Sequence, residues 1–265
     1  MRLPNKVVFI TDADHKSGKA LLLRLAAEGA SFLLNSASGG ERIESELERA
    51  RRSGARTFVV DVDLSSTPDV EAALASAAAS LGAVDVLIHN HDLVLPIRVE
   101  TGEEERFLEI MNANAKSAFV CTKAVGKQMQ AKQRGSMIYV SSIHAEKPTG
   151  SSFAYSASKG AVKMLAREAA VVLGRHGVNV NTIELGPVEG DDERFASDVS
   201  LLYDSYRYKV PNAVLGTYED VAELALFLAS DEARFVNGAD IRLDGGFLMH
   251  YMDFKMKKPL EGGGP

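Results

Sequence analysis

Short apolar runs alternate with longer amphipathic segments along most of this chain. The apolar runs are rich in Val, Ile, Leu and Phe, and they lie at residues 6–11, 31–35, 56–62, 84–90, 136–141, 178–185 and 240–244. Helical patterns lie at residues 17–28, 41–53, 67–81, 102–133, 154–174 and 218–229. Continuous apolar strands between helices are typical of a parallel sheet that is covered on both faces. The pattern therefore predicts an α/β fold, with one doubly wound sheet of about seven strands.

Length and composition are consistent with a single domain. The chain has 265 residues, of which 46% are hydrophobic and 25% charged. No repeat or linker divides it, so we expect one domain at residues 1–247 and a loose, glycine-ending tail at 248–265. The polar, irregular stretch at residues 187–212 is long enough to form a lid over a ligand crevice.

Net charge and cysteine content argue against several classes of partner and of covalent structure. The net charge is −6 and no Lys/Arg stripe is present, which argues against a nucleic-acid partner. The single cysteine, Cys121, excludes an internal disulfide and is expected to be a buried, unreactive thiol. The first strand follows the N-terminus directly and no charge-free window is long enough for a membrane span. We therefore expect a cytoplasmic protein without a membrane partner.

The stretch SSIHAEKPTGSSFAYSASKGA, residues 141–161, carries candidate chemistry. Tyr155 and Lys159 are four residues apart, so they share one face of the predicted helix. An ammonium near a phenol stabilises the phenolate and lowers a tyrosine pKa that is ordinarily about 10. Tyr155 is therefore a candidate proton donor and acceptor for an alcohol or carbonyl oxygen, which Ser142 at the preceding strand end would hold. Tyr251 and Lys255 have the same spacing, but no strand end precedes them, and we interpret that copy as chance.

These residues, in this order, give the chain a resemblance to the short-chain dehydrogenases/reductases, from Lys6 to Phe247. Further matching segments are Asp61-Val62, Asn114 in NANAKSAF and Asp244-Gly245-Gly246. The resemblance implies a Rossmann-like fold and a catalytic tetrad of Tyr155, Lys159, Ser142 and Asn114. In the family, the asparagine holds a water, the lysine also binds the nicotinamide ribose, and the tyrosine is the acid/base. It also implies a homo-oligomer, a tetramer or dimer, that pairs through helices such as 113–133 and 154–174.

The cofactor side departs from the family pattern. The family turn T-G-x-x-x-G-x-G reads TDADHKSG here, so two glycines have become Asp12 and Lys16. Gly18 and the helix start that it opens still favour an anion. The family's Asn-Asn-Ala-Gly reads HNHD, residues 89–92, and a carboxamide-binding threonine is missing after the sixth strand. The expected cofactor contacts are Lys16, Ser17, Gly18, Ser36, Asp61, Val62, Asn90, Tyr155, Lys159 and Val188.

Cofactor choice depends on the end of the second strand. An acidic residue there would bind the ribose 2′-hydroxyl of NAD, whereas small or basic residues leave room for the 2′-phosphate of NADP. Ser36 and Ser38 occupy this place, and His15 or Lys16 would reach a phosphate. The sequence favours NADP and leaves NAD open.

The sequence predicts an oxidoreductase that transfers hydride between NADP(H) and a secondary alcohol or ketone. The altered glycine turn keeps open an alternative, a non-catalytic ligand-binding or scaffold member of the family. An enoyl reductase is a weaker alternative, because that branch spaces its tyrosine and lysine more widely. No histidine spacing indicates a metal site, and His91 and His144 are interpreted as structural.

Overall fold

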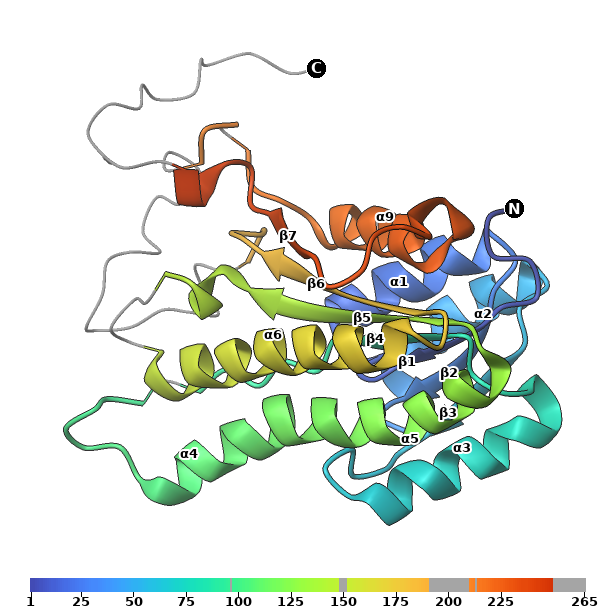
Figure 1. Cartoon of the computed structure of the whole chain (residues 1–265), viewed down its shortest axis with the longest axis horizontal. Coiled ribbons are helices and arrows are strands. Elements are labelled where there is room, and N and C mark those ends of the chain that lie inside the picture. The colour runs from blue at the N-terminus through green and yellow to red at the C-terminus, as the bar shows by residue number, and fades with distance from the viewer. Residues whose placement is uncertain (96, 148–151, 191–209, 213, 250–265) are drawn as a thin grey trace.

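The computed structural model describes residues 1–95, 97–147, 152–190, 210–212 and 214–249 (Figure 1). Most of the predicted lid at 187–212 and the tail beyond residue 249 lie outside the described residues.

A seven-stranded sheet forms the centre of the described part of the chain, and every neighbouring pair of strands is parallel. Its order is β3-β2-β1-β4-β5-β6-β7. The strands are β1 (Val7–Ile10), β2 (Ser31–Asn35), β3 (Thr57–Val60), β4 (Val86–His89), β5 (Gly135–Ser142), β6 (Val178–Leu185) and β7 (Asp240–Leu243). The strand order reverses between β1 and β4, which places a ligand crevice at the carboxyl ends of these strands. The predicted Rossmann-like fold is confirmed.

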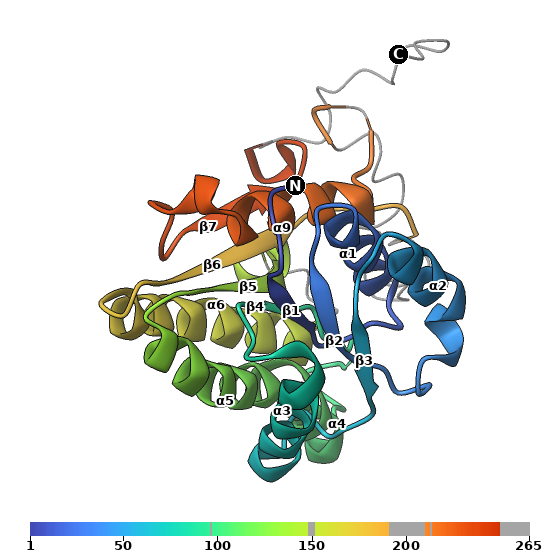
Figure 2. The same ribbon diagram turned by 90° about the vertical axis from the view of Figure 1, so that its right-hand side faces the viewer.

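Helices cover both faces of the sheet (Figures 1 and 2). One face carries α1 (Lys16–Ala26), α2 (Glu44–Arg52) and α9 (Tyr218–Ala229). The other carries α3 (Thr67–Leu81), α5 (Ser117–Lys132) and α6 (Phe153–Gly174). Short turns of 3-10 helix lie at η1 (Glu41–Ile43), η3 (Ile143–Ala145), η4 (Asp231–Ala233) and η5 (Phe247–Met249).

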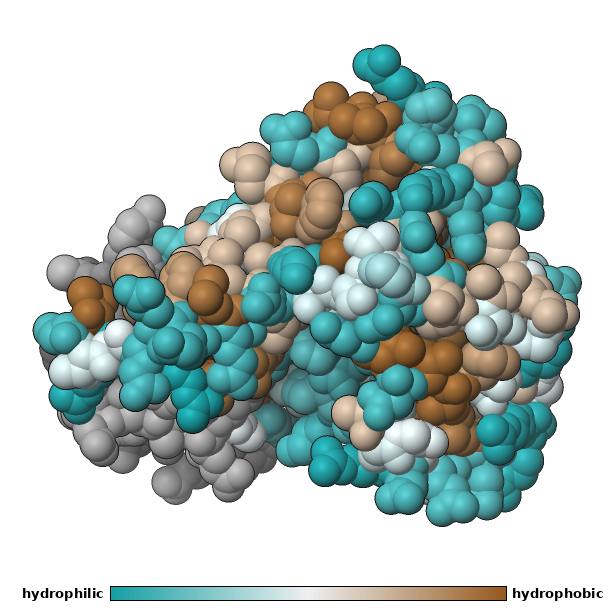
Figure 3. Space-filling view, turned by 90° about the horizontal axis from the view of Figure 1, so that it is seen from below, coloured by the Kyte–Doolittle hydropathy of each residue, from teal (hydrophilic) through white to brown (hydrophobic). Residues whose placement is uncertain are grey.

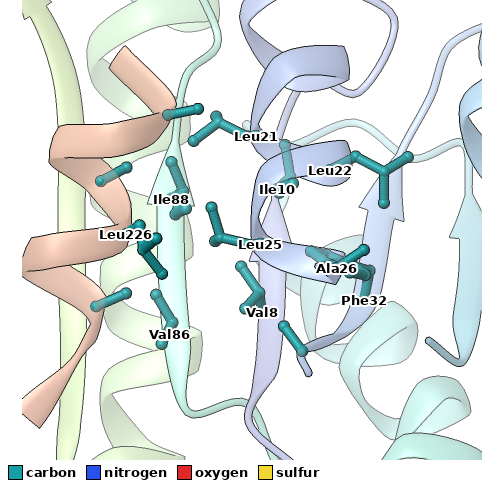
Figure 4. Packing of buried hydrophobic residues seen from close by; sticks show 14 of the residues in the cluster. Val8, Ile10, Leu21, Leu22, Leu25, Ala26, Phe32, Val86, Ile88 and Leu226 are labelled. Atoms are coloured by element: carbon teal, nitrogen blue, oxygen red, sulfur yellow. The ribbon is translucent and has the colours of Figure 1, made fainter. Parts of the chain in front are cut away.

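The alternation of side chains along β1 divides the core into two layers. Val8 and Ile10 pack toward α1 and α9, beside Leu25 and Leu226 (Figure 4). Val7 and Phe9 point to the opposite face and join the cluster under α3, α5 and α6. Burial of one such side chain stabilises the fold by about 1.5–3 kcal/mol. Both layers together hold the carboxyl ends of the strands in a fixed position.

The segment predicted as one helix over residues 102–133 is interrupted. It consists of α4 (Glu104–Met111), a π-helical turn η2 (Asn112–Lys116) and α5. The hydrophobic period of a helix does not reveal such a turn, because a π-helical turn adds only one residue to it. Turns of this kind are frequent at functional sites, and this one contains Asn114.

None of the helices in the described ranges is both long and apolar enough to span a bilayer.

Cys121 lies on α5 in the core under the sheet and is fully buried. Burial raises the pKa of its thiol to about 12, because the thiolate would lose its hydration. We expect the folded chain to resist a thiol-specific disulfide reagent at mildly alkaline pH, and the chain unfolded in guanidinium to react at its one cysteine. Fast, complete labelling of the folded chain would show that the thiol is accessible and contradict this prediction.

Candidate functional site

Tyr155 and Lys159 lie together where β5 ends. Both are on α6 and each is 1% exposed. The Lys159 Nζ lies 5.5 Å from the centre of the Tyr155 ring and donates a hydrogen bond to the Val140 carbonyl at 3.3 Å. The four-residue spacing therefore brings the phenol and the ammonium together at the carboxyl edge of the sheet.

Lys159 forms an ion pair that the sequence did not predict. Its Nζ lies 2.8 Å from Oδ1 of Asp92, whose side chain is 13% exposed. Asp92 follows β4 and occupies the position where the family pattern has the last glycine of Asn-Asn-Ala-Gly. A buried ammonium without a counter-charge is strongly unfavourable, so the carboxylate stabilises Lys159 in its charged form.

Asn114 fixes the segment that carries Asp92. Its Oδ1 accepts the Leu93 N–H at 2.8 Å, and its Nδ2 donates to the Leu93 carbonyl at 2.9 Å. The same Nδ2 donates to Ser158 Oγ at 3.0 Å, and Asn114 is completely buried. The asparagine side chain thus ties the loop after β4 to α6. It does so through Leu93 and Ser158, the chain neighbours of Asp92 and Lys159.

Ser142 ends β5 and is connected to Tyr155 through His144. Its Oγ accepts the His144 N–H at 3.3 Å, and the residue is 7% exposed. The His144 ring packs edge-on against the Tyr155 ring, with centres 5.3 Å apart. Tyr155 also packs with Phe247 in a small hydrophobic cluster near the end of the described chain. The four residues of the predicted tetrad therefore all lie around the carboxyl ends of β4 and β5.

His89 is a buried, neutral histidine on the same edge. Ser117 Oγ donates its proton to the Ala113 carbonyl, so it accepts a hydrogen bond from His89 Nε2 at 2.8 Å. The other ring nitrogen, Nδ1, has no hydrogen-bond partner among the described residues. Burial lowers the pKa of His89 well below its ordinary value, because the charged imidazolium would lose its hydration.

The turn between β1 and α1 is closed by Asn90 and Gly18. Asn90 accepts the Asp12 N–H at 2.9 Å and donates to the Asp12 carbonyl at 2.7 Å and to Ser17 Oγ at 3.0 Å. A Cβ on Gly18 would lie 2.0 Å from the Asp12 carbonyl oxygen, so only glycine fits there. The glycine that the sequence retains is the one that the tight turn requires.

The start of α1 is partly occupied by side chains of its own turn. Asp12 Oδ1 accepts the His15 N–H at 3.1 Å, and His15 Nδ1 accepts the Ser17 N–H at 3.2 Å. The His15 ring also packs edge-on against Tyr218, at 5.1 Å. Lys16 is exposed and lines a hollow of about 320 Å³ together with Glu189. The structure therefore uses His15 to cap α1, whereas the sequence suggested it as a phosphate contact.

The remaining predicted cofactor contacts lie around the crevice. Ser36 is buried directly after β2, where it meets the carboxylate of Asp14 at 2.7 Å. The Val62 N–H donates to Asn35 Oδ1 at 3.1 Å, which joins the ends of β2 and β3, and Asp61 beside it is exposed. Val188 is buried after β6.

Sequence reasoning missed the roles of two aspartates. Asp14 was not singled out, and Asp92 was noted only as a departure from the family pattern. For Asp14, the available signal was an acidic residue in a nucleotide-binding turn. That residue has no evident partner until β1 and β2 are placed side by side. Among the described residues, no group of three or more His, Cys, Asp or Glu side chains is arranged to hold a metal ion.

Comparison with known proteins gives a family match over most of the chain. The matching family model is described as enoyl-(acyl carrier protein) reductase and covers residues 16–248. A 3-oxoacyl-(acyl-carrier-protein) reductase of Staphylococcus epidermidis is 27% identical over 245 residues, which are 92% of this chain and all of the relative. A 2-dehydro-3-deoxy-D-gluconate 5-dehydrogenase of Formosa agariphila is 28% identical, covering 92% of each chain.

Solved structures give the same result. A gluconate 5-dehydrogenase from Burkholderia cenocepacia, crystallised with NADP and tartrate, superposes with a TM-score of 0.86 and 27% identity. The match covers 94% of this chain and 98% of that one. The sheet order, the family model and these relatives agree, and the chain belongs to the short-chain dehydrogenase/reductase family of oxidoreductases.

Proposed function

We propose that this protein transfers hydride between NADP(H), or alternatively NAD(H), and a secondary alcohol or its ketone, with Tyr155 as the acid/base. The observation that carries the proposal is the buried Tyr155–Lys159 pair at the carboxyl edge of the sheet, where Ser142 ends β5. Relatives named as an oxoacyl reductase and as sugar-acid dehydrogenases act on the same functional group, a carbonyl carbon or its alcohol.

The residues have distinct tasks in this proposal. In the ketone-reducing direction, Tyr155 gives its hydroxyl proton to the substrate oxygen, and the ammonium of Lys159 stabilises the phenolate that remains. Ser142 holds the same oxygen through its hydroxyl. Asn114 acts on the position of these groups, because it ties the loop after β4 to α6. In the alcohol-oxidising direction the proton moves from substrate to Tyr155.

The donors of the crevice fit a dinucleotide. Gly18 allows the tight turn at the start of α1, and Asn90 braces it. The Ser36 hydroxyl and the Lys159 ammonium would serve the two ribose ends once a ligand competes with Asp14 and Asp92, which bind them in this structure. The nicotinamide ring of such a cofactor supplies or accepts the hydride, which no side chain does. The NADP-bound gluconate 5-dehydrogenase supports NADP(H) as the carrier.

A second candidate function is a non-catalytic, ligand-binding member of the family. The observation that favours it is that Asp12, Asp14 and Asp92 each bind a group that a dinucleotide would use. The buried tyrosine–lysine pair argues against it, since a scaffold has no physical need for a costly buried ammonium. We therefore retain the enzyme as the main proposal.

We further propose that the protein forms a homo-oligomer through α5 and α6. Figure 3 shows hydrophobic patches among hydrophilic residues on the side of α3, α4 and α5. Large apolar side chains exposed on α5 and α6 are Phe119, Phe153, Met164, Val171 and Val172. Such side chains gather where protein surfaces meet.

The reduced, buried Cys121 is consistent with a cytoplasmic location.

Replacing Tyr155 with phenylalanine tests the enzyme directly. Tyr155→Phe removes the proton donor and should lower kcat by about a hundredfold or more. Ketone substrates of the oxoacyl and sugar-acid classes are screened first, with NADPH oxidation as readout. Tyr139→Phe is the control, because this buried tyrosine on β5 lies in the core cluster and bonds to Thr122, and the variant should keep most of the activity. Undiminished turnover in Tyr155→Phe would contradict the assignment.

Replacing Asp92 with asparagine should lower the thermal stability of the protein and make that stability depend more strongly on bound nucleotide. Asp92→Asn leaves the Lys159 ammonium without its counter-charge, and loss of one partner of a buried pair costs about 3–5 kcal/mol. We expect a lower Tm for the nucleotide-free variant and a larger rise of Tm with saturating NADPH than in the unmodified protein. The control Asp69→Asn changes an exposed aspartate on α3. An unchanged Tm in Asp92→Asn would show that the ion pair does not stabilise the fold.

A charge on α6 should weaken self-association. Val171→Glu places a carboxylate at a position that is 71% exposed and, in the proposed oligomer, buried. Light scattering after gel filtration should give an oligomer for the unmodified protein and a smaller species for this variant. Val99→Glu, at a valine that is 67% exposed outside α5 and α6, should keep the oligomer. A monomer in the unmodified protein would refute this interface.

A further inference from the structure

The carboxylate of Asp14 occupies a set of hydrogen-bond donors directly after β2. Ser36 Oγ donates to Asp14 Oδ1 at 2.7 Å and Ser38 Oγ donates to the same oxygen at 2.9 Å. The Ser38 N–H donates to Asp14 Oδ2 at 2.9 Å. We refer to these three donors, two hydroxyls and one N–H, as the serine cradle.

The serine cradle is oriented before any ligand arrives. Ser36 Oγ accepts the Gly40 N–H at 2.9 Å, and Ser38 Oγ accepts the Arg42 N–H at 3.0 Å. The two hydroxyl oxygens lie 3.1 Å apart, and both are placed to direct their protons at the same oxygen, Asp14 Oδ1. Ser36 is 1% exposed, so its hydroxyl is held by the protein rather than by solvent. The cradle is therefore a built anion site, and Asp14 supplies the anion.

The position of the serine cradle in the fold identifies the ligand group that would use it. Asp14 belongs to the turn between β1 and α1, and the Ala13 N–H donates to the Asn35 carbonyl at 2.9 Å, which joins this turn to the end of β2. In a doubly wound nucleotide-binding fold, the residue at the end of the second strand contacts the 2′ position of the adenosine ribose. That position carries a hydroxyl in NAD and a phosphate in NADP.

We propose that Asp14 sets the preference between these two cofactors, an inference that rests on the proposed dinucleotide-dependent function. A 2′-phosphate needs the donors that Asp14 now holds, and it meets the negative charge of the carboxylate there. A 2′-hydroxyl can instead donate to that carboxylate without displacing it. Asp14 therefore weakens the binding of NADP(H) relative to NAD(H), through repulsion and competition for the same donors.

The charge balance at this point supports the same conclusion. Within the described part of the chain, the bonds of the Asp14 carboxylate come from Ser36 and Ser38, and no ion pair neutralises it. His15, which would otherwise offset a phosphate charge, is used to cap α1. The site that would receive the ribose 2′ group therefore keeps the negative charge of Asp14 when a cofactor approaches.

Dissociation constants of NADPH and NADH, measured by calorimetry for the unmodified protein and for Asp14→Ser, test the proposal. Serine removes the charge and frees the serine cradle, so we expect the ratio of the NADPH to the NADH dissociation constant to fall about tenfold or more. Competition by adenosine 2′,5′-bisphosphate against 5′-AMP should change in the same direction. Asp14→Asn removes the charge with little change of shape and gives the same test if the serine variant does not fold.

Asp12→Ser is the matched control. It removes the same charge from the same turn, but its carboxylate bonds to the His15 N–H and not to the serine cradle. Any effect there should be common to both cofactors and leave the ratio within about threefold. An unchanged ratio in the Asp14 variants, or an equal change in Asp12→Ser, would overturn the role of Asp14 while leaving the dinucleotide-dependent function intact. Absence of binding of either cofactor to every protein would overturn both.

Discussion

The crevice depends on the ion pair between Lys159 and Asp92. An ammonium that is 1% exposed has lost nearly all of its hydration, and this loss is offset only by a close anion and by hydrogen bonds. The Val140 carbonyl supplies one such bond, and Asp92 supplies the charge. Asn114 keeps the loop after β4 against α6, so the two charges stay in reach of each other and of Tyr155.

The same physical requirement explains the two other aspartates of the crevice. Asp12 satisfies an N–H at the start of α1, and Asp14 satisfies the hydroxyls after β2. Together with Asp92, they place a carboxylate at three points where a dinucleotide would present a pyrophosphate, an adenosine ribose and a nicotinamide ribose. In the proposed function, a bound cofactor therefore competes with the protein's own carboxylates for these hydrogen-bond donors.

Much of the fold was predictable, because the core follows from hydrophobic periodicity. The bounds of β2, α3 and β6 agree with the predicted segments, and the spacing of Tyr155 and Lys159 placed them on one helical face. The interactions that connect distant segments were not predictable in the same way. Asp14 and Ser36 meet only once β1 and β2 are paired, and the π-helical turn at Asn114 leaves no mark on the periodicity.

A crystal structure of the protein with bound NADPH tests the central claim most directly. The account predicts that Lys159 Nζ contacts a ribose hydroxyl and that its 2.8 Å contact with Asp92 is lengthened or lost. It also predicts that the Asp14 carboxylate leaves the serine cradle to the 2′-phosphate. A complex in which NADPH is bound while both aspartates keep their present partners would contradict this competition for donors.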